Sequence, residues 1–229
     1  MDLLTLFEKF KLTLQYHKGL NPKLWSNDKL DSTLVDQAKD LAYKFATFSG
    51  VDKKRIKDIV FTGSNANFNY TKFSDVDIHI VSDLSGLDSD KIYDKKVEWT
   101  HKHNLKYKDY PLEFYMHNVE DHLPSDQGVY SILTNTWETK PARIKDAKKI
   151  LDDPHTANKV QHYIELVKKL LKDPDNRDPI IDFKMKMWKG RTAGLHSGGE
   201  FSIENIIYKD LRNRGLIDKL NKKLEKLKS

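Results

Sequence analysis

Two short motifs carry the side chains best suited to chemistry in this sequence. The first is Gly63-Ser64 at the end of an apolar run, and the second, ten residues further on, is Asp75 and Asp77 in alternation with apolar residues. A Gly-Ser bend after a strand points backbone N–H groups and a hydroxyl at an anion such as a triphosphate. Because side chains alternate along a strand, both carboxylates share one face, with Cα atoms about 6.5–7 Å apart. Such a pair can hold one or two divalent cations, and Mg²⁺ prefers oxygen ligands.

A third carboxylate would complete a site of this kind. The run from Tyr110 to His117 alternates as a strand, with Leu112 and Phe114 on one face and Glu113 on the other. If this strand neighbours the one that carries the aspartates, we expect Glu113 to face the same way. Asp75, Asp77 and Glu113 are therefore the predicted metal ligands.

The elements needed to position these residues follow from hydrophobic periodicity. The fold class predicted is α/β (α+β), with a small mixed sheet of about four strands and flanking helices, followed by a helical C-terminal part. Strands are predicted at 56–61, 74–81, 110–117 and 129–133, and helices at 3–14, 32–48 and 89–103. After Pro141 the pattern predicts only helices, at about 156–172, 179–193 and 202–227 with a break at Gly215. We place one domain at 1–140 and a second, helical and basic, at 141–229.

Charge is concentrated at one end of the chain. The 229 residues have a net charge of +6, and the segment from Lys184 to Ser229 holds 12 basic against 5 acidic residues. This excess predicts an anionic partner, a nucleotide or a nucleic acid, although a solvated lysine-rich helix face has the same composition. Lys189 and Arg191 are the candidates to bind a triphosphate.

Composition excludes several classes of protein. With no cysteine, the chain has no disulfide framework, thiol catalysis or iron–sulfur cluster, so a metal must bind oxygen or imidazole. No window reaches 18 uncharged apolar residues, and the N-terminus lacks a leader pattern. The sequence predicts a cytoplasmic protein with no membrane partner.

The three motifs together resemble the nucleotidyltransferase superfamily of the DNA polymerase beta type. They stand here as FTGS, DVDI and LEFY, and the run from Phe61 to Val81 also resembles predicted nucleotidyltransferases of large tailed phages. The resemblance implies transfer of a nucleoside monophosphate from an NTP such as ATP to an acceptor hydroxyl, with release of pyrophosphate (EC 2.7.7 type). RNA or DNA are candidate acceptors.

The same resemblance assigns roles to the candidate residues. Gly63 and Ser64 would bind the β and γ phosphates, and Asp75 and Asp77 would ligate two Mg²⁺ or Mn²⁺ ions. Glu113 would ligate the catalytic ion and help deprotonate the acceptor. Two alternatives stay open: a catalytically silent module of this fold that binds nucleic acid or a partner protein, and acids that only form the wet face of a half-buried sheet.

Overall fold

The computed structural model describes residues 11–121 and 127–227, which form two compact units. One unit is Tyr16–Arg143, which contains the sheet, and the other combines residues 144–227 with 11–15 and is helical. Along these described residues, none of the helices has the length and apolar character required to cross a bilayer. Each unit is described by itself below.

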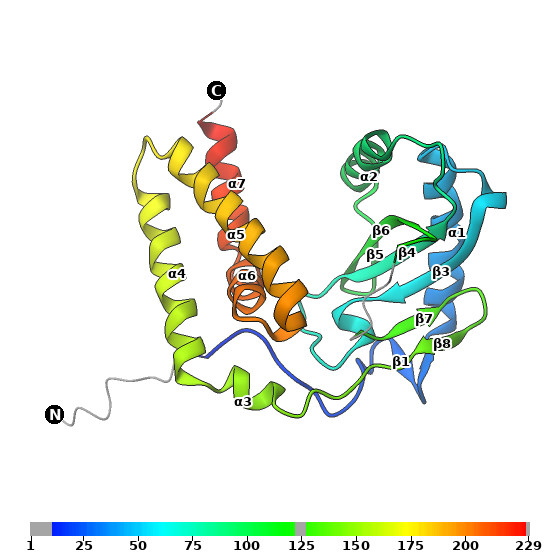
Figure 1. Cartoon of the computed structure of the whole chain (residues 1–229), viewed down its shortest axis with the longest axis horizontal. Coiled ribbons are helices and arrows are strands. Elements are labelled where there is room, and N and C mark those ends of the chain that lie inside the picture. Colours follow the sequence, from blue (N-terminus) through cyan, green and yellow to red (C-terminus); the bar gives the residue numbers. More distant parts are fainter. Residues whose placement is uncertain (1–10, 122–126, 228–229) are drawn as a thin grey trace. The chain divides into compact units, whose positions relative to one another are not determined.

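The first unit is built on a mixed sheet (Figure 1), which within the described residues has six strands in the order β5-β6-β4-β3-β7-β8. Strands β4 and β6 are parallel and the other neighbours are antiparallel. The bounds are β3 Ile56–Thr62, β4 Val76–Ser82, β5 Lys106–Tyr107, β6 Tyr110–Asn118, β7 Val129–Ser131 and β8 Thr136–Thr139. A separate two-stranded hairpin pairs β1 Trp25–Ser26 with β2 Lys29–Leu30.

Two helices accompany this sheet. Helix α1, Ser32–Phe48, begins at Asp31, whose side chain accepts a hydrogen bond from the Thr33 N–H and so satisfies one of the free donors of the first turn. Helix α2, Ser89–His103, joins β4 to the parallel strand β6, since parallel neighbours need a crossover connection. Trp99 of α2 packs against Phe45 and Phe48 of α1, which ties the two helices together.

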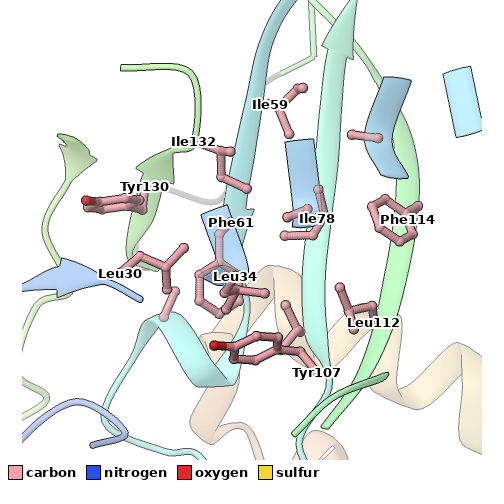
Figure 2. Close-up of a cluster of buried hydrophobic side chains, with 14 of the residues drawn as sticks. Leu30, Leu34, Ile59, Phe61, Ile78, Tyr107, Leu112, Phe114, Tyr130 and Ile132 are labelled. Carbon is pink, nitrogen blue, oxygen red and sulfur yellow. The ribbon is translucent and has the colours of Figure 1, made fainter. Parts of the chain in front are cut away.

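The hydrophobic core of this unit includes buried side chains of β4, β6 and α1 (Figure 2). Ile78 of β4 and Phe114 of β6 are register partners and are buried with Leu34 of α1. Between the buried positions of β4, Asp77 and His79 are only half-buried. Alternation therefore places the polar residues of β4 and β6 together on the face opposite the core.

The second unit consists of helices α3 to α7 and the short 3₁₀ turn η4 Gly199–Phe201. The helices are α3 Ala147–Leu151, α4 Pro154–Lys172, α5 Arg177–Gly198, α6 Ile203–Asn213 and α7 Leu216–Lys226. Its core is mostly aliphatic and includes Val160, Ile180 and Ile206. Asp210 of α6 is fully buried and accepts hydrogen bonds from the backbone and hydroxyl of Thr13, at 2.6 and 2.8 Å, which ties the described start of the chain to the helices.

The fold class predicted from sequence is confirmed, but several elements differ. The sheet has six strands in the described residues instead of about four, because β5 and β8 are too short or too polar to show strand periodicity. The helix predicted over 3–14 is wrong for Lys11–Leu14, which are not helical, and residues 3–10 lie outside the described residues. Helix α3 was not predicted.

Candidate active site

Gly63 leaves the space in which the Asp77 carboxylate lies. Gly63 follows β3 with φ of +79°, a conformation that residues with a side chain rarely adopt. A Cβ at this position would lie 2.1 Å from Asp77 Oδ2 and 3.0 Å from its Cγ. The missing side chain thus leaves the space that the Asp77 carboxylate occupies, and the adjacent pairing of Thr62 with Asp77 brings the two segments together.

The register of the parallel pair brings the second acid to Asp77. Asp77 and Glu113 are Cα partners across β4 and β6, as are His79 and Tyr115 one step further along. Partners in a parallel pair point to the same face, so both carboxylates lie on the polar face of the sheet. Asp75 precedes β4 by one residue and is half-buried.

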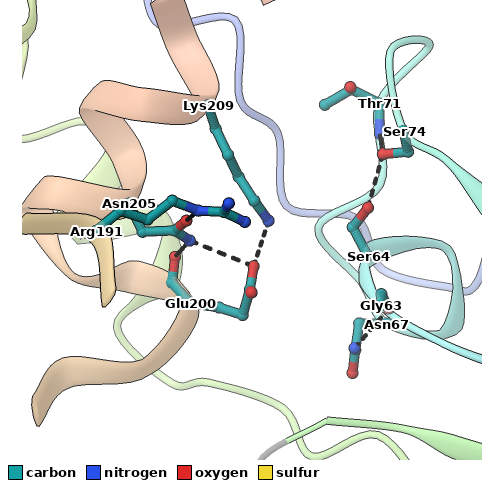
Figure 3. Close-up of polar contacts among 9 residues, drawn as sticks. All are labelled: Gly63, Ser64, Asn67, Thr71, Ser74, Arg191, Glu200, Asn205 and Lys209. Atoms are coloured by element: carbon teal, nitrogen blue, oxygen red, sulfur yellow. Dashed lines mark hydrogen bonds and ion pairs between the residues drawn. The ribbon is translucent and has the colours of Figure 1, made fainter. Parts of the chain in front are cut away.

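Ser64 belongs to a hydrogen-bonded loop (Figure 3). Its hydroxyl donates to Ser74 Oγ at 2.8 Å, and Ser74 Oγ also accepts the Thr71 N–H at 2.9 Å. The loop that separates the two motifs is therefore closed on itself, immediately before Asp75.

Two asparagine side chains form hydrogen bonds with the backbone of the Gly-Ser bend and of the segment before β4. Asn65 donates to the Asp75 carbonyl at 2.9 Å, and Asn67 donates to the Gly63 carbonyl at 2.8 Å. Both side chains are buried, so these bonds fix the backbone that joins the Gly-Ser bend to the aspartates.

Beside the acids, Tyr115 and Lys96 form a second layer of polar contacts. The Tyr115 hydroxyl donates a short hydrogen bond to Glu113 Oε2, and Lys96 Nζ of α2 lies 3.7 Å from the centre of the Tyr115 ring. Burial lowers the pKa of Lys96, while the negative charges of Glu113 and Asp77 oppose that shift. Lys96 thus places a positive charge within electrostatic range of the two acids.

His79 fills the next position along the polar face. Its ring stacks on Tyr115, with centroids 4.8 Å apart, and lies 5.7 Å from His117. Burial, then the charges of His117 and Lys96, lower the pKa of His79 to about 4. His79 is therefore neutral at pH 7. Burial likewise raises the pKa of Tyr115, followed by the charges of Asp77 and Glu113, so its hydroxyl stays protonated and able to donate.

The three acids have the oxygen ligands that a hard divalent cation prefers, but their side chains are not grouped closely enough to bind one as they stand. In residues 11–121 and 127–227, no three His, Asp or Glu side chains are grouped closely enough to hold a metal ion. The oxygen donors of Asp75, Asp77 and Glu113 suit Mg²⁺, and Gly63 provides the space for one of them that a Cβ would fill. The assignment of these three residues as metal ligands stays a prediction.

The two basic residues predicted to bind a triphosphate lie in α5 of the helical unit. Lys189 is exposed, whereas Arg191 stacks over the Tyr208 ring at 4.5 Å and donates to Asn205 Oδ1 at 3.1 Å. Asn205 in turn donates to the Glu200 carbonyl at 2.8 Å (Figure 3). Arg191 therefore contributes to the packing of its own unit, and a role for either residue in nucleotide binding stays a prediction.

Sequence reasoning missed Lys96 and the support given by Asn65. The helical pattern over 89–103 places Lys96 on the same side as Ile92 and Trp99, and a lysine on an otherwise apolar side is the feature that could have identified it. No comparable pattern distinguishes a buried loop asparagine from an exposed one.

Comparison with known proteins places this unit in a family. The model of the nucleotidyltransferase domain family matches residues 44–133, a segment that contains the Gly-Ser bend and all three acids. Residues 44–133 therefore contain a nucleotidyltransferase domain, which supports the superfamily predicted from sequence. Such a domain supports transfer of nucleoside monophosphates from NTPs in general, a reaction of the EC 2.7.7 type.

Two further comparisons add little. The chain is similar to a STING-associated CdnE c-di-GMP synthase from Capnocytophaga granulosa, with 14% identity over 90% of this chain and 75% of that chain. The TM-score is 0.21, so this likeness carries no inference about this chain. No curated protein matches the sequence. The resemblance to phage nucleotidyltransferases stays a prediction.

Proposed function

We propose that this chain is an active, metal-dependent nucleotidyltransferase that transfers a nucleoside monophosphate from an NTP to an acceptor hydroxyl. The observation that carries the proposal is the placement of Asp77, which lies against Gly63 and is in register with Glu113. Two general properties support the proposal: the backbone of a Gly-Ser bend can bind a polyphosphate, and carboxylates are ligands that Mg²⁺ prefers.

Each of the candidate residues has a separate proposed role in this reaction. Gly63 and Ser64 would bind the β and γ phosphates of the NTP. Asp75, Asp77 and Glu113 would hold two Mg²⁺ or Mn²⁺ ions, which would supply positive charge for the phosphates and lower the pKa of the attacking hydroxyl. Glu113 accepts the hydroxyl proton as the new oxygen–phosphorus bond forms. The bond to the bridging oxygen breaks, and pyrophosphate leaves.

Glu113 already has a hydrogen-bond partner next to the proposed cation site. The Tyr115 hydroxyl donates to Glu113, so in this arrangement one carboxylate oxygen is already engaged. Tyr115 can keep that bond while the other oxygen turns to the cation, since a carboxylate accepts several hydrogen bonds. We infer that Tyr115 orients Glu113, and does not itself react.

The test is a search for the product. The full chain is incubated with each of the four α-labelled NTPs, with Mg²⁺ or Mn²⁺, and with tRNA, single-stranded oligonucleotides, aminoglycosides or protein lysate in turn. We expect cation-dependent release of pyrophosphate and transfer of label to one acceptor class. Binding of nucleic acid with no pyrophosphate release under any of these conditions would overturn the proposal in favour of a catalytically silent module.

Lys96 provides a test of cation binding that does not depend on activity. Lys96→Met removes a positive charge that interacts with Asp77 and Glu113. Because like charge opposes binding of a cation, we expect the variant to bind Mn²⁺ about fivefold more tightly in the absence of NTP, about 1 kcal/mol of electrostatic free energy. Mn²⁺ titration followed by electron paramagnetic resonance measures the affinity.

The matched control is Lys91→Met, the same change on the same helix. Lys91 is strongly exposed and forms an ion pair with Asp88 at 3.7 Å. Its affinity for Mn²⁺ should equal that of the unaltered protein. Equal affinities in the Lys96 and Lys91 variants would show that Lys96 does not act on the cation site.

A further inference from the structure

A cavity lies within the sheet unit, on residues that the nucleotidyltransferase motifs do not include. It is a cavity of about 270 Å³, close to the lower limit of small-molecule pockets. Its lining combines aromatic rings with three cations and one acid: Phe68, Trp137, Lys18, Lys140, Arg143 and Asp28.

The aromatic side of the cavity is fixed in place. Trp137 of β8 stacks on Trp25, with centroids 4.6 Å apart and planes at 14°, and its indole N–H donates to the Asp28 carbonyl at 3.0 Å. Trp25 covers one face of the Trp137 indole, so the cavity meets the opposite face or the edge. A rigid aromatic surface of this kind can stack a nucleobase without loss of side-chain freedom.

The remaining charged residues of the lining are mostly cationic. The Arg143 guanidinium lies 4.1 Å from the centre of the Phe68 ring and donates to the backbone carbonyl of Lys18. Lys140 lies 3.6 Å from Asp28, and both side chains remain largely exposed. Three cations against one carboxylate leave a positive excess, which favours an anionic ligand.

One lining residue of this cavity, Phe68, lies in the same loop as the Gly63-Ser64 bend, which we propose binds the donor phosphates. Phe68 directly follows Asn67, whose side chain donates to the Gly63 carbonyl at 2.8 Å and accepts the Gly128 N–H at 3.0 Å. Phe68 and Gly63 thus belong to one hydrogen-bonded loop. A ligand that contacts Phe68 binds beside the loop on which the proposed donor phosphates would rest.

We propose that this cavity binds a nucleotide, free or as part of a single strand, which is the acceptor of the transfer. The aromatic surface would hold the base and the cations the phosphate. Binding follows from the cavity itself, whereas the role of acceptor rests on the proposed function.

The experiment measures binding and transfer separately in the full chain. Fluorescein-labelled RNA and DNA single strands of eight nucleotides are titrated by fluorescence anisotropy at several salt concentrations, with AMP as unlabelled competitor. The variant Lys18→Gln/Lys140→Gln removes two cavity cations. The control Lys39→Gln/Lys57→Gln removes the same charge from two exposed lysines of the same unit.

We expect the cavity variant to bind the strand about tenfold more weakly, with a salt dependence smaller by about 1.4 in log–log slope, while the control is unchanged. Competition by AMP would identify a free nucleotide as a ligand, and its absence would identify a strand. Both results support the cavity as a nucleotide site.

Four results would overturn the inference, part of it, or the proposed function on which the acceptor role rests. If the unaltered chain binds neither strand nor AMP, or if the cavity variant binds like the control, the site does not exist. If the cavity variant weakens binding of Mg²⁺-NTP as much as binding of the strand, the cavity holds the donor, and the acceptor assignment is wrong. Strand binding at the cavity without pyrophosphate release from any NTP would leave the site standing and overturn the proposed function alone.

Discussion

Asp77→Asn is expected to lower cation-dependent pyrophosphate release by about 10³-fold, equivalent to about 4 kcal/mol of transition-state stabilisation. The substitution keeps the shape of the side chain in the space over Gly63 but removes the charge that would bind the cation. The backbone pairing of β4 with β3 and β6 does not involve this side chain. We therefore expect the free energy of unfolding to change by no more than about 1 kcal/mol.

The control for this prediction is Asp36→Asn on the exposed side of α1, which makes the same change in net charge. Pyrophosphate release is followed by a coupled phosphate assay, and stability by urea denaturation. Full activity of Asp77→Asn would remove Asp77 from the catalytic residues. A large loss of stability would instead show that its carboxylate is structural.

Gly63→Ala is expected to destabilise the sheet unit by about 3 kcal/mol and to abolish activity. One part of this cost is the strain of a side chain at φ of +79°, about 1 kcal/mol or more. The other part is the overlap of the new Cβ with Asp77 Oδ2, which would be 2.1 Å away and must move. Urea denaturation measures the sum.

Gly86→Ala separates these two causes. Gly86 has a similar φ of +73°, but nothing lies within 4 Å of the position of its Cβ. The loss in the free energy of unfolding caused by Gly86→Ala should therefore come from backbone strain alone. In an Asp77→Ala background, where only a 3.3 Å contact between Cβ atoms remains, the cost of Gly63→Ala should fall towards that of Gly86→Ala. An unchanged cost would mean that the carboxylate does not occupy the space over Gly63.

The acids of the site could be predicted from sequence because their spacing follows the period of a strand. Asp77 and Glu113 each stand between apolar residues that are buried in the structure, so alternation alone assigns them to the polar face. Their pairing could only be assumed. Which strands are neighbours, and in which register, depends on how α2 packs after the crossover, and no local pattern encodes it.

The residues that surround the acids could not be predicted from the sequence as well as the acids themselves. The contact of Lys96 with Tyr115 joins a helix to a strand, and it arises from the packing of α2 through Trp99. Strand β8 has a mostly exposed pattern, and its position at the edge of the sheet is set by pairing with β7. Such features come from tertiary contacts, which override local preference.

The parallel pairing of β4 with β6 also has a kinetic consequence. Asp77 and Glu113 are separated in the chain by 35 residues that include all of α2, so no hairpin can bring them together early. Closing so long a segment is slow compared with forming a helix or a turn. In refolding, the capacity to capture a divalent ion should therefore appear after helical circular dichroism has recovered, and would mark the last stage of assembly.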